Sequence, residues 1–189
     1  MIDLFEAALE IQQFLLGRRW RHCIIGGLAV ARWGEPRATQ DVDVSLLTGF
    51  GDERDYVEPI LGEFSARVPD AHRFALENRV LLISASNGTP IDVALAGIPF
   101  EHAMMDRASF FAFAPDVSLI TCSAEDLIVL KAFAGRDVDW IAIAGILASQ
   151  RDRLDWNYVD EQLQPLCELK EDRQTPRHLE QLRRRLDTP

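Results

Sequence analysis

The chain has 189 residues, 48% of them hydrophobic, which is enough for one compact core and few for two. Its 30 acidic and 20 basic residues give a formal net charge of −10, so the composition does not favour a broad nucleic-acid-binding surface. The cysteines, Cys23, Cys122 and Cys167, lack Cys-x-x-Cys spacing and predict neither a structural zinc site nor a disulfide framework, as in a reduced cytoplasm.

The N-terminal residues mix acidic and apolar side chains, unlike a secretory signal, and no apolar run reaches the length of a membrane span. We therefore expect a cytoplasmic protein with no membrane partner. Residues 3–16 have apolar side chains at helical spacing, which predicts an amphipathic helix that covers a sheet.

A glycine pair separates the first predicted strand from the next helix. Residues 23–25 form a short apolar run typical of a buried strand, and residues 28–33 have a helical apolar pattern. Gly26 and Gly27 let a ligand approach the backbone closely, and the N–H groups at a helix start suit phosphate oxygens. The turn therefore predicts either a phosphate site or an ordinary strand-to-helix connection.

Two aspartates lie on one face of the second predicted strand, residues 40–47. Its apolar residues alternate, so Asp41, Asp43 and Ser45 share the opposite face. Asp is disfavoured in strands, and neighbouring carboxylates repel each other unless water or a divalent cation accommodates them. The alternatives are a solvated strand face and a cation site.

A third carboxylate lies in a predicted hairpin. Residues 56–68 predict a helix, and residues 79–86 and 90–96 then predict two strands joined by a turn at Asn87-Gly88-Thr89. If the hairpin lies beside the Asp41 strand, Asp92 completes a site of three carboxylates, which suits Mg²⁺ or Mn²⁺. Residues 110–113 and 117–122 predict further strands.

The last third of the chain predicts helices. Residues 123–126, Ser-Ala-Glu-Asp, form a capping box that starts an almost wholly apolar, and therefore buried, helix. Lys131 lies in this helix among apolar neighbours, where an ammonium is costly unless it is paired or reaches solvent. Asp139, which follows Gly135, is one candidate partner, and a bound anion is the other. Further helices are predicted over residues 140–148, 157–169 and 176–186.

The order of these motifs resembles the DNA polymerase β-like nucleotidyltransferase superfamily. Its pattern is a strand, Gly-Gly or Gly-Ser, a helix, Asp-x-Asp and a later strand with a third acid. The matching residues are Gly26, Gly27, Asp41, Asp43 and Asp92.

A narrower resemblance is to AbiEii-type toxins and related small bacterial nucleotidyltransferases, in which an Arg-x-Thr-x-Asp-x-Asp run recurs. Arg37 and Thr39 precede the two aspartates at this spacing. Those proteins also carry a Lys on a later helix, an Arg five residues further on, and acids that open the next helix. Lys131, Arg136 and Asp139 match this pattern, whereas Ala142 stands where a second acid is common.

The resemblance implies an α+β nucleotidyltransferase fold, in which helices cover a small mixed β-sheet. Residues 1–122 would form the core and residues 123–189 a helical part packed on it, as a single compact domain overall.

The resemblance also implies metal-dependent transfer of a nucleoside monophosphate from a nucleoside triphosphate to a hydroxyl of an RNA, a protein or a small molecule. A toxin–antitoxin role would add an antitoxin partner. Asp41, Asp43 and Asp92 would hold Mg²⁺ or Mn²⁺ and, with Lys131, catalyse the transfer. The nucleotide would contact Gly26, Gly27, Arg37, Thr39, Lys131 and Asp139.

Two other functions would use the same residues. The first is a catalytically inactive nucleotide-binding regulator, which the departure at Ala142 favours slightly. The second is a divalent-metal nuclease. The three functions predict different products from nucleotide and acceptor.

Overall fold

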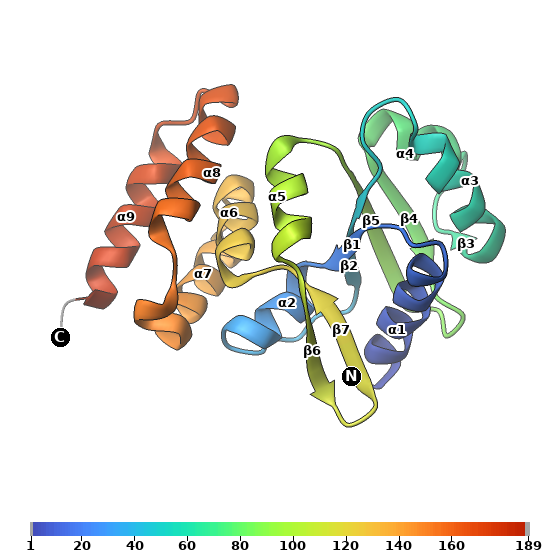
Figure 1. Ribbon diagram of the computed structural model, residues 1–189, viewed down its shortest axis with the longest axis horizontal. Helices are drawn as coiled ribbons and strands as arrows, with labels where there is room; N and C mark the ends of the chain where they lie inside the picture. The colour runs from blue at the N-terminus through green and yellow to red at the C-terminus, as the bar shows by residue number, and fades with distance from the viewer. Residues whose placement is uncertain (1, 188–189) are drawn as a thin grey trace. The chain divides into compact units, whose positions relative to one another are not determined.

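A seven-stranded mixed sheet organises the first of the two compact units into which the chain divides. The computed structural model describes residues 2–187 and has the expected α+β class. The first unit comprises Met1–Leu28 and Ala38–Cys122, and the second comprises Ala29–Arg37 and Ser123–Pro189. Every described strand belongs to the first unit, and the described regular structure of the second is helical (Figure 1).

The strands of the first unit occur in the order β3-β4-β5-β2-β1-β7-β6 across the sheet. They are β1 (His22–Ile24), β2 (Val42–Leu47), β3 (Ser65–Ala66), β4 (Val80–Ser84), β5 (Pro90–Ala96), β6 (Ser109–Ala114) and β7 (Val117–Thr121). The helices of this unit are α1 (Ile2–Gly17), α3 (Glu53–Glu63), α4 (Ala71–Asn78) and α5 (Pro99–Arg107). Helix α2 (Gly26–Trp33) begins in the first unit and continues into the second.

The central strand β2 has one antiparallel and one parallel neighbour. It pairs antiparallel with β1 and parallel with β5, and β5 pairs antiparallel with β4. The β4–β5 hairpin turns at Gly88, whose φ of +83° suits glycine, while the side chain of Asn87 accepts a hydrogen bond from the N–H of Thr89. The predicted hairpin is therefore confirmed, and it lies beside the predicted aspartate strand.

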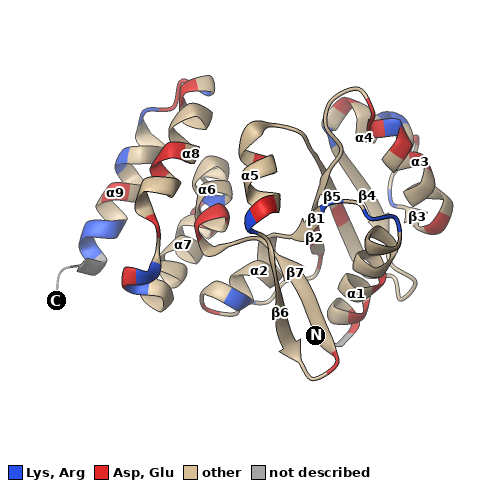
Figure 2. Cartoon of the chain, viewed as in Figure 1, with Lys and Arg blue, Asp and Glu red and all other residues tan. Residues whose placement is uncertain are grey.

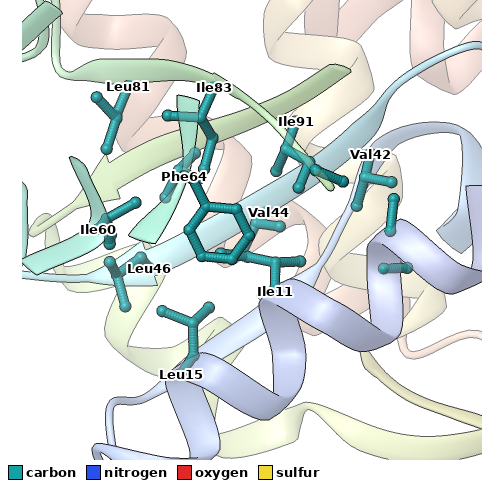
Figure 3. Packing of buried hydrophobic residues seen from close by; sticks show 14 of the residues in the cluster. Ile11, Leu15, Val42, Val44, Leu46, Ile60, Phe64, Leu81, Ile83 and Ile91 are labelled. Carbon is teal, nitrogen blue, oxygen red and sulfur yellow. The ribbon is translucent and has the colours of Figure 1, made fainter. Parts of the chain in front are cut away.

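The core of the first unit lies between helix α1 and the sheet. Ile11 and Leu15 of α1 pack with the alternating apolar residues of β2, β4 and β5 and with Phe64 (Figure 3). Full burial of each such side chain stabilises the fold by roughly 1.5–3 kcal/mol. A solvated strand face, one of the two alternatives for β2, does not extend to Ser45, which is 2% exposed, so the strand is covered on both sides at that point.

Between β2 and the hairpin, the predicted helix over residues 56–68 is displaced. Helix α3 begins and ends earlier, and the chain then forms the short strand β3 and a further helix, α4. The stretch 97–106, which carries no clear sequence signal, contains most of α5.

The second unit contains α6 (Ala124–Ala134), α7 (Asp137–Gln150), a 3₁₀ turn η1 (Arg151–Arg153), α8 (Trp156–Leu169) and α9 (Gln174–Asp187). Helix α6 packs against α7, α8 and α9. Its start is the predicted capping box: the N–H of Asp126 donates to the hydroxyl of Ser123 at 3.1 Å, and the Asp126 carboxylate accepts from the N–H of Ser123. Across residues 2–187, every helix is too short or too polar to span a bilayer.

Helices α1 and α8 carry acidic residues and no basic ones, whereas basic residues gather towards the end of α9 (Figure 2). There Arg184 pairs with Glu180 at 2.7 Å, and the guanidinium of Arg183 lies over the ring of Trp156. These contacts within the second unit account for part of the basic run at the end of the chain.

His22, the first residue of β1, is a buried histidine whose surroundings favour its neutral form. It is 5% exposed, and its Nδ1 lies 2.9 Å from the carbonyl oxygen of Trp20, which can only accept, so Nδ1 carries the proton. Its Nε2 is buried with no hydrogen-bond partner among the described residues. Burial lowers the pKa of His22 from 6.5, although the Trp20 contact opposes the shift.

We therefore expect His22 to make the folded protein less stable in mild acid. Because the folded pKa is lowered, the unfolded chain binds the proton first, and stability is lost as the pH falls below 6.5. Urea unfolding at about pH 7.5 and about pH 5.5 should show a smaller loss for His22→Asn than for the native chain. The exposed His102 provides the control: His102→Asn should keep the native loss, and an equal loss in His22→Asn would contradict the assignment.

Candidate active site

Strands β2 and β5 bring two of the predicted acids together. The strands are parallel neighbours, and Asp43 is the register partner of Asp92. The flanking residues of β2, Val42 and Val44, are fully buried in the core, so the alternation of the strand turns Asp43 to the other face. Asp41 directly precedes β2.

Three carboxylates converge at this point of the sheet. Asp41, Asp43 and Asp92 are each half-buried, and each offers one oxygen such that the three atoms lie within 4.8 Å of one another. Like charges opposed on adjacent strands destabilise a sheet. Carboxylate oxygens at this spacing are the donor set that Mg²⁺ and Mn²⁺ prefer, so the residues present fit such a cation.

Neighbouring residues shift the pKa of Asp92 and orient the carboxylate of Asp41. Burial raises the pKa of Asp92, the charge of Asp41 raises it further, and the guanidinium of Arg67 opposes the shift. The hydroxyl of Thr39 donates to Oδ1 of Asp41 at 2.9 Å. Thr39 therefore orients the carboxylate of Asp41.

Sequence patterns do not indicate Arg67, which donates to the carboxylate of Asp92. It follows the two-residue strand β3 and lies 25 positions before its partner. No motif joins two such positions, and the surrounding residues predict a helix. Only the pairing of β3 with β4 brings this arginine to the site.

The glycine pair lies against the same acids. The N–H of Ile25 donates to the carbonyl of Asp43 at 2.9 Å, which holds the turn beside β2. Gly26 has φ +59°, and a Cβ there would overlap the Asp43 carboxylate, while a Cβ on Gly27 would lie 2.6 Å from Cβ of Thr39. Both glycines thus make room for the acidic site, and the first N–H groups of α2 need acceptors outside the helix.

Replacing Gly26 with alanine is expected to destabilise the protein by about 1–3 kcal/mol, because it combines a left-handed backbone with an overlap on Asp43. Chemical unfolding measures this loss. Gly88→Ala is the matched control, since Gly88 has φ +83° but nothing within 4 Å of an added Cβ. Equal losses in the two variants would show that the contact with Asp43 contributes nothing.

A second cluster of predicted residues lies within the helical unit. Lys131 of α6 donates to Oδ1 of Asp139 at 3.2 Å, and Nε of Arg136 donates to Oδ2 at 2.6 Å. Asp139 is fully buried and Lys131 is 5% exposed. Burial alone would raise the pKa of Asp139, but the hydrogen bonds from Arg136 and Lys131 outweigh it and lower that pKa.

The predicted residues thus fall into two groups. The first unit brings together Asp41, Asp43, Asp92, Gly26, Gly27 and Thr39. The second unit holds Lys131, Asp139 and the exposed Arg37. The ion pair between Lys131 and Asp139 is one of the two expected partnerships, and the approach of Lys131 and Arg37 to a nucleotide stays a prediction.

A strand, a glycine turn, a helix and three acids on or next to two neighbouring strands are the arrangement expected of the nucleotidyltransferase class of fold, and comparison with a solved structure supports it. No protein-family model and no curated protein matches the sequence. The chain is similar to the crystal structure of an antigenic nucleotidyltransferase-like protein from Paracoccidioides brasiliensis, at 16% identity and a TM-score of 0.55, over 94% of this chain and 91% of that chain. This likeness shows the fold, so the expected nucleotidyltransferase fold is confirmed.

Two further solved structures are more distant. One is the lincosamide antibiotic adenylyltransferase LnuA with lincomycin bound, at 11% identity, 73% and 92% coverage of this chain and that one, and a TM-score of 0.49. The other is ANT(2″)-Ia in complex with adenylyl-2″-tobramycin, at 16% identity, 95% and 94% coverage, and a TM-score of 0.46.

Proposed function

We propose that the protein is a metal-dependent nucleotidyltransferase, which moves a nucleoside monophosphate from a nucleoside triphosphate to an acceptor hydroxyl. The observation that carries the proposal is the convergence of Asp41, Asp43 and Asp92 within 4.8 Å on neighbouring segments of a nucleotidyltransferase fold. Buried side chains surround β2 and β5, so the sheet holds the acids in place.

The three acids would hold Mg²⁺ or Mn²⁺. When bound, such a cation neutralises charge on the phosphates and makes the phosphorus a better electrophile. The donor set supports this role because all its members are carboxylates, which carry the negative charge that a divalent cation balances.

The chain's own residues would supply binding, orientation and proton transfer. The N–H groups of Gly26 and Gly27 would donate to phosphate oxygens, at the positive end of α2. An oxygen of Asp92 that the cation leaves free would accept the proton of the acceptor hydroxyl. Lys131 and Arg37, by the resemblance, would neutralise the triphosphate.

The finer proposal is an AbiEii-type enzyme that modifies an RNA or a protein and has an antitoxin partner. Two observations support it: Thr39 of the Arg-x-Thr-x-Asp-x-Asp run bonds Asp41, and Lys131, Arg136 and Asp139 of the helical motif form one cluster.

The test is incubation of the purified protein with each α-labelled nucleoside triphosphate, Mg²⁺ and cell extract, followed by separation of RNA, protein and small molecules. We expect label in one of these fractions for the native chain and none for Asp43→Ala. Label in RNA or protein supports the finer proposal, and label in a small molecule contradicts it.

Other outcomes would assign the site differently. Tight nucleotide binding with no transfer by either protein would indicate an inactive regulator. Cleavage of nucleic acid without added nucleotide would indicate a nuclease.

A further inference from the structure

Arg67 contacts the candidate site from the edge of the sheet. Its guanidinium donates to Oδ1 of Asp92, and its Nε donates to the carbonyl oxygen of Ile83 at 2.9 Å. Nη2 also lies 3.5 Å from the carbonyl oxygen of Ile91. One side chain thus reaches from β3 across β4 to the third acid on β5.

The backbone fixes this guanidinium independently of Asp92. The N–H of Arg67 donates to the carbonyl of Leu82 at 3.0 Å and continues the pairing of β3 with β4. The two carbonyls that Nε and Nη2 contact belong to Ile83 and Ile91, which are register partners. Since a guanidinium is a rigid planar fork of donors, these anchors set the direction of the donor that meets Asp92.

Stability alone explains little of this arrangement. The side chains of Arg67 and Asp92 are 29% and 34% exposed, and ion pairs that reach solvent contribute about 0–1 kcal/mol. Electrostatic repulsion gives the contact another role, because the Asp92 carboxylate lies beside its register partner Asp43 and close to Asp41. Repulsion would turn an unrestrained Asp92 away from these acids.

We propose that Arg67 is a positioning residue: it holds Oδ1 of Asp92 so that Oδ2 remains the oxygen for the divalent cation shared with Asp41 and Asp43. This inference rests on the proposed function, whose cation the three acids bind. Arg67 acts through Asp92 and need not touch the nucleotide. Partners that orient metal-ligating carboxylates commonly change metal affinity about 10- to 100-fold when they are removed.

The test is a titration of the full chain with Mn²⁺ in the absence of nucleotide and acceptor. Electron paramagnetic resonance measures the fraction of Mn²⁺ that is bound. Arg67→Met should weaken Mn²⁺ binding about 10- to 100-fold. Arg67→Lys should also weaken it, because an ammonium is a point donor that cannot hold Ile83 and Asp92 together. The control is Arg73→Met, which removes an exposed arginine paired with Glu77 on α4.

A double-mutant cycle separates positioning from general damage to the fold. In the Asp92→Asn background, Arg67→Met should cause little further loss of Mn²⁺ affinity, since the residue acts through that carboxylate. The melting temperature of every variant is measured in parallel. If Arg67→Met has a much lower melting temperature than the native chain, the Mn²⁺ affinity of Arg67→Lys decides the test.

Three results would overturn the inference: native or tighter Mn²⁺ binding by Arg67→Met, full recovery in Arg67→Lys, or an undiminished loss in the Asp92→Asn background. The native chain and Asp43→Asn separate this inference from the proposed function. If the native chain binds Mn²⁺, Asp43→Asn does not, and the Arg67 variants bind it as tightly as the native chain, the inference fails and the proposed function stands. If the native chain does not bind Mn²⁺, the proposed metal dependence and this inference fail together. If the variants show the expected Mn²⁺ affinities but the native chain transfers no nucleotide, the proposed transferase activity is wrong and the role of Arg67 in orienting Asp92 stands.

Discussion

Replacing Asp43 with asparagine is expected to lower the rate of nucleotidyl transfer by about 10³-fold, equivalent to several kcal/mol of lost transition-state stabilisation. Asparagine keeps the shape of the side chain but removes its negative charge. Because Asp43 is the register partner of Asp92 and lies with Asp41 in the same cluster, the substitution removes one of the three carboxylates that would hold and orient the cation. The rate of label transfer at saturating Mg²⁺ measures the effect.

The same substitution should affect stability in the opposite direction. Removing one of three crowded negative charges relieves repulsion, so Asp43→Asn in the presence of a chelator should melt at or above the native temperature. Added Mg²⁺ should raise the melting temperature of the native chain and have little effect on the variant. Asp52→Asn, at an exposed position before α3, is the control and should behave as native. Native transfer rates in Asp43→Asn would reject the proposed site.

Local signals were sufficient to predict much of this site. Asn87-Gly88 is a sequence typical of hairpin turns, and the alternation in β2 identifies which residues face the core. A further step, that the hairpin lies beside β2, was a hypothesis at the sequence level and is confirmed by the register of Asp43 with Asp92. The resemblance supplied the order of motifs, and that order made the hypothesis specific.

The region between β2 and β4 was harder to predict, for identifiable reasons. Helix α4 ends at Arg79, which has φ +54°, a conformation that glycine or asparagine usually adopts after a helix, so the sequence does not indicate this helix end. Strand β3 has two residues, too few for any periodic pattern. The tertiary structure therefore decides the path of this segment, and with it the position of Arg67.

The burial of Ser45 has a similar origin. Alternation in β2 correctly separates apolar from polar positions, but it does not reveal what lies on the polar side. Helix α5 packs against β2, and the stretch from which α5 forms has no clear helical pattern. The side of β2 that carries the aspartates is consequently buried at Ser45 and partly exposed at Asp43.

The buried ion pair of the second unit leads to the largest expected change in stability. Asp139→Asn should destabilise the protein by about 3 kcal/mol, because it leaves the ammonium of Lys131 buried without a counter-charge. Urea unfolding at neutral pH measures the loss. Lys131→Met should cost less, since Asp139 keeps the guanidinium of Arg136. The control is Asp137→Asn, an exposed acid in the first turn of the same helix.

The pH dependence of the Asp139 contribution has a definite sign. The folded pKa of Asp139 is lowered from 3.8 by Arg136 and Lys131 against the effect of burial, so its contribution is present above 3.8 and is lost as the pH falls through the folded pKa. Asp139→Asn should therefore show a weaker dependence of stability on pH in this acidic range than the native chain.

The Lys131–Asp139 pair also separates the two roles expected for Lys131. If the lysine serves the fold alone, adding Lys131→Met to Asp139→Asn should restore stability, because no buried charge then lacks a partner, and Lys131→Met should transfer nucleotide as the native chain does. If Lys131 also neutralises the triphosphate, Lys131→Met should remain folded yet lose about 10²-fold in transfer. A double variant less stable than Asp139→Asn would contradict the ion-pair assignment, because the methionine would then have removed more than an unpaired charge.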